Sequence, residues 1–296
     1  MTSVPSTANA AGPRGDGAMD AAYAPGRTLP LRVEIVRQFK RRRTLVMFGL
    51  LLALPWILVV AFSLGPAPAQ QNSLRLSDLA TQGGLNFAAF TLSVSATLLL
   101  VVAVALFCGD TVASEASWSS LRYLLAAPVP RDRLLRQKLT VALGYSAAAV
   151  IALPVMALLA GTVAFGWNDI RLPGTGETIA ASSVLPRFGI VIGYALVSQL
   201  VVAALAFLLS VSTDSPLGAV GGAVGLVIVS NILQAVEALG VVREFLPTFW
   251  STAWLDALAP QLDWSGMIKG ASLSVTYAVI LVALAFRRFR RKDVVS

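Results

Sequence analysis

Long uncharged apolar runs alternate with short charged stretches along this chain of 296 residues. A membrane-spanning helix needs about 20 mostly apolar residues. Six runs qualify, and they predict spans at about residues 45–64, 86–108, 139–165, 188–211, 216–236 and 267–286. The pattern therefore predicts an all-α integral membrane protein, with a bundle of six transmembrane helices within residues 29–290.

The segments that flank these runs have a different composition. Residues 1–28 are rich in Ala, Gly, Pro, Ser and Thr, which predicts a disordered tail. In residues 29–43, apolar side chains at helical spacing alternate with charged ones, which favours an amphipathic helix lying on the membrane surface. An ordinary charged flank without a helix is the alternative. Residues 291–296 form a short basic tail.

Lysine and arginine are distributed unequally between the two sides that six spans define. The segment before the first span carries eight, the segment after the second span five and the C-terminal tail five, against five on the other side. Because cytoplasmic segments are enriched in Lys and Arg, we expect both termini to be cytoplasmic and the protein to be multi-pass in the plasma membrane. We interpret the net charge of +8 as a collar that faces anionic membrane lipids rather than nucleic acid.

The composition also excludes several kinds of chemistry. The chain has no His and one Cys, which leaves no Cys/His metal site and no His-based catalytic triad. It has no P-loop sequence for ATP hydrolysis. We therefore expect no catalytic residues, no metal site and no cofactor in this chain.

Two segments outside the spans are unusual. Residues 237–265 are too apolar for a solvated loop and too interrupted for a span, which predicts short helices that re-enter or lie in the outer membrane face. Residues 110–138 begin with Asp110 and Glu115 and then combine an apolar patch, a proline pair and several arginines. We interpret this second segment as an amphipathic docking elbow, although its charges also fit plain topology signals.

The elbow resembles the type-2 permease subunits of ABC exporters, which often carry a Glu, a small-residue pair, a Leu-rich stretch, Pro-Val-Ser-Arg and a Lys after span two. Ser119 and Pro130 depart from that pattern, at positions where Gly and Ser are common. The resemblance extends to the six-span plan, and it implies a coupling helix that contacts a separate ATPase subunit, which binds ATP and Mg²⁺. The coupling positions that it implies are Glu115, Leu121, Arg122, Leu124, Leu125, Pro128, Arg131 and Lys138.

Neutral polar and small residues are the remaining candidates inside the spans. Gln199, Asn231 and Gln234 would line a substrate path or, alternatively, form hydrogen bonds between helices. Glycines at GxxxG spacing predict close helix packing without naming the partner helix. They are Gly189, Gly193, Gly218, Gly221, Gly222 and Gly225.

These patterns favour an export permease, not an enzyme, that moves a hydrophobic or amphipathic substrate. Because six spans are few for a pathway, we expect a second permease copy or a paralogue beside the ATPase. The alternative is an ATP-independent ion-coupled carrier or channel. No charged residue is expected deep in any span, which disfavours that alternative.

Overall fold

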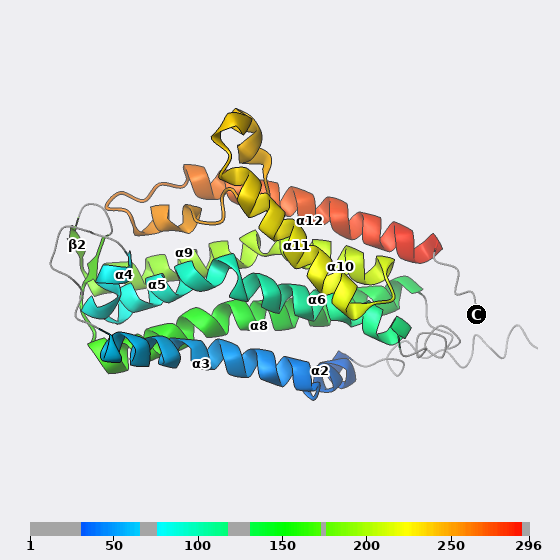
Figure 1. The fold of residues 1–296 in the computed structure, drawn as a ribbon, viewed down its shortest axis with the longest axis horizontal. Coiled ribbons are helices and arrows are strands. Elements are labelled where there is room, and N and C mark those ends of the chain that lie inside the picture. The colour runs from blue at the N-terminus through cyan, green and yellow to red at the C-terminus, as the bar shows by residue number, and fades with distance from the viewer. Residues whose placement is uncertain (1–30, 66–75, 118–130, 173–175, 292–296) are drawn as a thin grey trace, which may run out of the picture.

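The computed structural model describes residues 31–65, 76–117, 131–172 and 176–291 (Figure 1). In this part of the chain the protein is helical apart from one two-residue β-ladder. The elements before residue 118 are α2 (Leu31–Phe39), α3 (Arg42–Leu64), α4 (Leu76–Leu79), η1 (Ala80–Gln82), α5 (Gly84–Thr97) and α6 (Leu99–Ser117). The elements after residue 130 are α8 (Arg131–Phe165), β1 (Ile170–Arg171), β2 (Thr178–Ile179), α9 (Ala181–Ser198), α10 (Leu200–Ser212), α11 (Pro216–Gln234), η2 (Glu237–Phe245), η3 (Ala253–Leu258) and α12 (Ser265–Arg291).

The helices confirm the prediction of an all-α, multi-span membrane protein. Five helical stretches are long and apolar enough to cross a bilayer: α3, α8, the α9–α10 pair, α11 and α12. The pair α5–α6 makes a sixth if it is one span, but it is bent by 52°. The bend falls at Leu98, whose φ of −132° and ψ of −56° interrupt the helix. The run predicted at 86–108 therefore forms two helices with a break at Leu98, which its sequence does not indicate because no Pro or Gly lies at the break.

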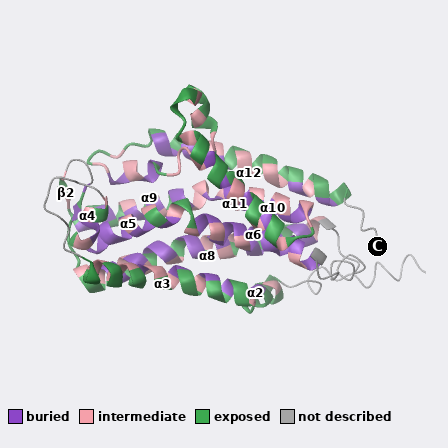
Figure 2. Ribbon diagram, viewed as in Figure 1, coloured by how far each residue is buried: buried purple, intermediate pink, exposed green. Residues whose placement is uncertain are grey.

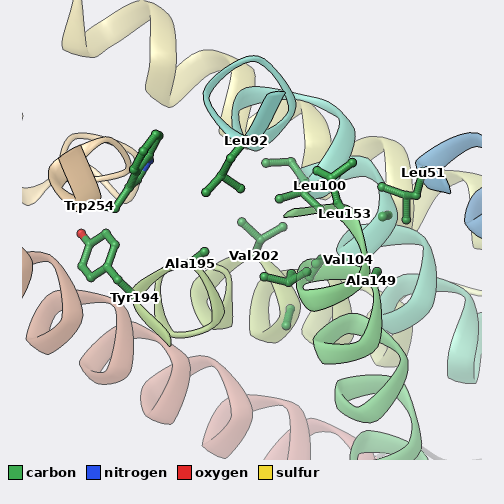
Figure 3. Close-up of a cluster of buried hydrophobic side chains, with 14 of the residues drawn as sticks. Leu51, Leu92, Leu100, Val104, Ala149, Leu153, Tyr194, Ala195, Val202 and Trp254 are labelled. Atoms are coloured by element: carbon green, nitrogen blue, oxygen red, sulfur yellow. The ribbon is translucent and has the colours of Figure 1, made fainter. Parts of the chain in front are cut away.

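The core lies where α6, α8 and α10 meet. Helix α10 packs between α6 and α12, while α8 contacts α3, α5 and α6. Leu100 and Val104 of α6 lie beside Leu153 and Ala149 of α8, close to Leu51 of α3 (Figure 3). Figure 2 shows this buried centre, with exposed residues along the outer faces of α3, α11 and α12. Those outer faces are largely apolar, as expected for helices surrounded by lipid.

The close helix contacts use glycines other than the predicted ones. A Cβ on Gly84 would lie 2.7 Å from the backbone nitrogen of Thr162, so this glycine allows α5 to approach α8. Gly109 allows α6 to approach α11 in the same way, near Val220. At several predicted positions a Cβ would meet nothing within 4 Å in the described part of the chain, so close packing there stays a prediction. These positions are Gly189, Gly193, Gly221 and Gly225.

Two further glycines of the predicted set have local surroundings. A Cβ on Gly218 would lie 3.4 Å from Ser215, the residue that caps α11. A Cβ on Gly222 would lie 3.1 Å from Leu209 of α10. Gly222 is thus the one glycine of the predicted set with a tight interhelical neighbour. Contact between the open glycine faces and a second chain stays a prediction.

The segment between α11 and α12 has an apolar tip and a buried base. Helix η2 protrudes from the side of the bundle (Figure 1), and Val241, Val242 and Phe245 on it are exposed. Trp254 of η3 is buried, and the Tyr194 hydroxyl of α9 donates a hydrogen bond to the Trp250 carbonyl at 2.5 Å. The short helices agree with the sequence pattern, and their depth in the membrane stays a prediction.

Helix α2 and the C-terminal end of α12 lie at one end of the bundle, whereas α4 and the β-ladder lie at the other (Figure 1). The first of these ends, which carries Arg41, Arg43, Arg287 and Arg291, is called the basic end below. The predicted helix in residues 29–43 exists as α2, but it is followed by a turn at Lys40–Arg41 before α3 begins. In the connection between α8 and α9, β1 and β2 form an antiparallel pair, with Ile170 opposite Ile179.

Candidate functional site

The last two turns of α6 carry acidic side chains at the basic end of the bundle. Ser114 lies four residues after Asp110, and Glu115 lies five residues after it. The three side chains therefore project from neighbouring faces of the helix. Helices α3 and α8 contact α6, and α2 contacts both α3 and α8. The acids therefore meet basic side chains from three different helices.

Glu115 is the centre of the first group of contacts. Its Oε1 atom lies 2.6 Å from Nζ of Lys138 in α8 and also contacts the guanidinium of Arg37 in α2. Lys138 Nζ lies 3.4 Å from Oε1 of Glu34, and Arg37 Nη1 lies 3.6 Å from Oε2 of Glu34. Charges of opposite sign thus alternate among four side chains and join α2, α6 and α8.

Asp110 is the centre of the second group, one turn further into the bundle. Its two carboxylate oxygens lie 2.7 Å from Nη1 of Arg41 and 2.7 Å from Nη1 of Arg43. Arg41 also donates a hydrogen bond to the Ser114 hydroxyl at 3.2 Å. Glu34, Arg37, Arg41, Arg43, Asp110, Glu115 and Lys138 together are called the ion-pair cluster below.

The burial of the ion-pair cluster corrects the interpretation of these charges as a lipid-facing collar. The Glu115 side chain is only 2% exposed and that of Lys138 only 3%. Asp110 is buried as well. Burial of these charges is tolerated because each carboxylate has two cationic partners. Correspondingly, Arg37, Arg41 and Arg43 face protein acids rather than forming a collar directed only at lipid.

A cavity of about 510 Å³ opens beside the ion-pair cluster. Its lining combines four guanidinium groups with two carboxylates and the Ser114 hydroxyl. Arg42, which is not part of the cluster, supplies the fourth guanidinium. Positive charge therefore exceeds negative charge around this opening, so that it favours an anionic group.

The ion-pair cluster also lies at the base of the predicted coupling elbow. Of the elbow residues, Leu121, Arg122, Leu124, Leu125 and Pro128 fall outside the described residues, and Arg131 is described only as the first residue of α8. Helix α6 ends at Ser117 and α8 begins at Arg131, so the Glu115–Lys138 ion pair joins the two helices that bound residues 118–130. The described part of the elbow is thus fixed to α2 at its base.

Two of the three predicted path residues line one cavity deeper in the bundle. This cavity, of about 70 Å³, lies between the bend of α5–α6, the junction of α9 and α10 and the end of α11, with Gln199 and Asn231 in its wall. Gln199 is only 9% exposed, and no hydrogen bond of its side chain is found among the described residues. A second, mostly apolar cavity of about 250 Å³ is also lined by Gln199. Gln199 thus lines one opening with mixed polar and apolar walls and one that is almost entirely apolar.

The third predicted path residue has a different role. Gln234 does not line the cavity, and its side-chain oxygen accepts a hydrogen bond from the Thr248 hydroxyl at 3.2 Å. Thr248 lies 2.8 Å from the Ser230 hydroxyl, so a short chain of hydrogen bonds ties α11 to the segment after η2. The contacts of Gln234 therefore fit the alternative prediction, in which the amide forms a hydrogen bond between packed segments instead of lining a path. Ser230 and Thr248 are absent from the sequence-based candidates because single hydroxyls give no signal in an apolar run.

Metal ligands are not grouped in the described ranges, where no three Cys, Asp or Glu side chains lie together in a way that could hold an ion.

The apolar helices and the charge cluster at one end of the bundle define a multi-span helical membrane protein. The chain belongs to the family described as "Protein of unknown function (DUF2705)", which matches residues 71–295. A search of the curated proteins found no match to the chain.

Proposed function

We propose that this chain is the transmembrane permease subunit of an ATP-driven ABC exporter in the plasma membrane. In this proposal, a separate ATPase subunit binds ATP and Mg²⁺, and two permease copies, or this chain and a paralogue, form the pathway. The substrate is hydrophobic or amphipathic, and both termini of the chain are cytoplasmic. The chain itself has no ATPase site and is not an enzyme.

The Glu115–Lys138 ion pair is the observation that carries the proposal. It connects the two helices that bound the elbow, and Arg37 extends the connection to α2. A force applied to residues 118–130 by a partner would therefore act on α2, α6 and α8 together. Buried charge pairs resist separation because an isolated charge is costly in an apolar environment. The arrangement suits a mechanical coupling between an external ATPase and the helix bundle.

The two cavities that share Gln199 support the proposed substrate class. One is lined in part by hydroxyl and amide groups and the other almost entirely by aliphatic side chains. A molecule with one polar and one apolar part would be complementary to both. Asn231 lies in the wall of the polar cavity, together with Gln199. Alternating access would then require the surrounding helices to change their relative tilt.

The bend between α5 and α6 favours one competing function. Ion-coupled carriers often place their sites at discontinuous helices near the middle of the membrane. The 52° bend adjoins the cavity of Gln199, so it fits a carrier as well as an exporter. Transport by the purified chain in vesicles with an ion gradient and without any ATPase would favour the carrier. Transport that needs both ATP and a second subunit would favour the exporter.

The decisive experiment is affinity purification of the full chain from native membranes, with mass spectrometry of the proteins that accompany it. We expect an ATPase subunit with wild-type protein. Leu124→Asp should abolish its recovery, because a charge would replace an apolar residue predicted to contact the partner. Glu177→Arg, in the loop that bears the β-ladder, is the control and should retain it. Equal recovery with the Leu124 variant, or no ATPase with wild-type protein at normal expression, contradicts the proposal.

A further inference from the structure

A third cavity lies between the ends of α10 and α12 at the basic end of the bundle. Its volume is about 610 Å³. The side chains in its wall divide into two kinds, three arginines from the last turns of α12 and leucines from both helices. They include Arg287, Arg288, Arg291, Leu208, Leu209 and Leu284. The cavity is therefore strongly basic on one part of its wall and aliphatic on the other.

The three arginines lack the acidic partners found in the ion-pair cluster. Among the described residues, no carboxylate lines the cavity or forms an ion pair with Arg287, Arg288 or Arg291. Arg290, on the same helical turn, instead places Nη2 at 3.0 Å from the Asp132 carboxylate of α8. Helix α12 thus pairs one arginine with the protein and presents three to this cavity.

The cavity also lies at the end of an apolar helical run. The uncharged run of α12 that follows Lys269 ends at Phe286, and a group of arginines begins at Arg287. In a membrane-spanning helix this change marks the boundary between the hydrocarbon layer and the headgroup region. Guanidinium groups bind phosphate oxygens with paired hydrogen bonds, whereas leucines contact alkyl chains. A ligand that carries a phosphate directly beside an apolar part is therefore complementary to this cavity.

We propose that this cavity binds one anionic phospholipid, with the headgroup phosphate on Arg287, Arg288 and Arg291 and the start of an acyl chain on the leucines. A basic pocket between helices at the membrane boundary is complementary to such a headgroup. The site is independent of the ATPase and of the substrate path. It attaches a lipid to α10, which packs between α6 and α12, so the bound lipid links the membrane surface to the centre of the bundle.

The test uses native mass spectrometry of the full-length protein in detergent, titrated with phosphatidylglycerol, phosphatidylcholine or inorganic phosphate. We expect one tightly bound phosphatidylglycerol and weak binding of the other two. Each arginine contributes about fivefold to affinity for an anionic headgroup, so the triple variant Arg287→Gln, Arg288→Gln, Arg291→Gln should bind more than about 100-fold more weakly.

The matched control removes the same total charge elsewhere. The control is the triple variant Arg32→Gln, Lys40→Gln, Arg136→Gln. Its three positions lie outside the cavity, so it should retain wild-type binding of phosphatidylglycerol. Circular dichroism of both triple variants checks that they remain helical. Equal loss in the two triple variants would show diffuse attraction and overturn the proposal. Equal binding of phosphatidylglycerol and phosphatidylcholine would do the same. Saturation of the site by inorganic phosphate at equal concentration would overturn the assignment to a lipid.

Discussion

Removal of either partner of the Glu115–Lys138 ion pair should destabilise the protein far more than removal of both. Lys138→Met leaves Glu115 buried with Arg37 as its remaining cationic contact. Glu115→Leu leaves the buried ammonium group with Glu34 alone, at 3.4 Å. Breaking a buried pair from one side costs about 3–5 kcal/mol. Since each remaining charge keeps one partner, we expect about 2–3 kcal/mol for each single variant.

The double variant removes both buried charges and leaves Glu34 and Arg37 as a pair within α2. Replacement of a buried ion pair by apolar residues of similar size is often close to neutral. The double variant should therefore lose less than about 2 kcal/mol, which makes it more stable than either single variant and at least about 2 kcal/mol more stable than the sum of the single effects predicts. Unfolding of the purified protein in mixed micelles, followed by tryptophan fluorescence, measures all four free energies.

The exposed pair Asp132–Arg290 is the matched control for this cycle. Its side chains are 34% and 64% exposed, so solvent weakens the attraction between them. Asp132→Asn and Arg290→Gln should each change the free energy of unfolding by no more than about 1 kcal/mol. Strictly additive effects of Glu115→Leu and Lys138→Met, each as small as those of the control pair, would refute the buried ion pair.

Three further predictions concern packing, the substrate path and topology. Gly84→Ala should lower the free energy of unfolding by about 1–3 kcal/mol, because its Cβ would lie 2.7 Å from the backbone nitrogen of Thr162. Gly221→Ala should leave the free energy of unfolding unchanged or raise it by up to about 1 kcal/mol, since no atom lies within 4 Å of its Cβ. Unfolding in mixed micelles measures the free energies of both variants. Gln199→Leu should reduce transport at normal protein level, and unchanged transport in a vesicle assay would remove Gln199 from the path. Reporters placed after Ser296 and within residues 169–183 should lie on opposite sides of the membrane, and the same side for both would contradict the predicted topology.

The apolar pattern predicted the helices well because a bilayer leaves few alternatives to a long helix. It could not predict the bend at Leu98, since that residue is an ordinary helix former with no Pro or Gly beside it. Close packing at Gly84 was equally hidden, because its sequence neighbourhood lacks the GxxxG spacing. Spacing along one helix reports a shared face, whereas the neighbour of that face depends on the whole bundle.

The candidate sites show the same division. The resemblance to type-2 permease subunits singled out Glu115 and Lys138 from the sequence. Their burial depends on α2, which precedes the turn at Lys40, contacts α8 and reaches Glu115 of α6 through Arg37, and no local pattern shows these contacts. Gln199 and Asn231 were recognised because amides are rare in apolar runs. Their common cavity arises only from the packing of α10 against α6 and α11.

The contact of α12 with the segment before it gives this helix a fixed point near one end. A Cβ on Gly270 would lie 2.6 Å from the Trp250 Cβ, and Trp250 is in turn hydrogen-bonded to Tyr194. Helix α12 can neither slide nor rotate at Gly270 unless Trp250 moves. Arg291 lies 21 residues further along α12, at about 32 Å for a rise of about 1.5 Å per residue. A tilt of about 10° at this fulcrum would move Arg291 by about 5.5 Å, so the helix acts as a lever that amplifies small motions of the Trp250 segment at the opposite end of the bundle.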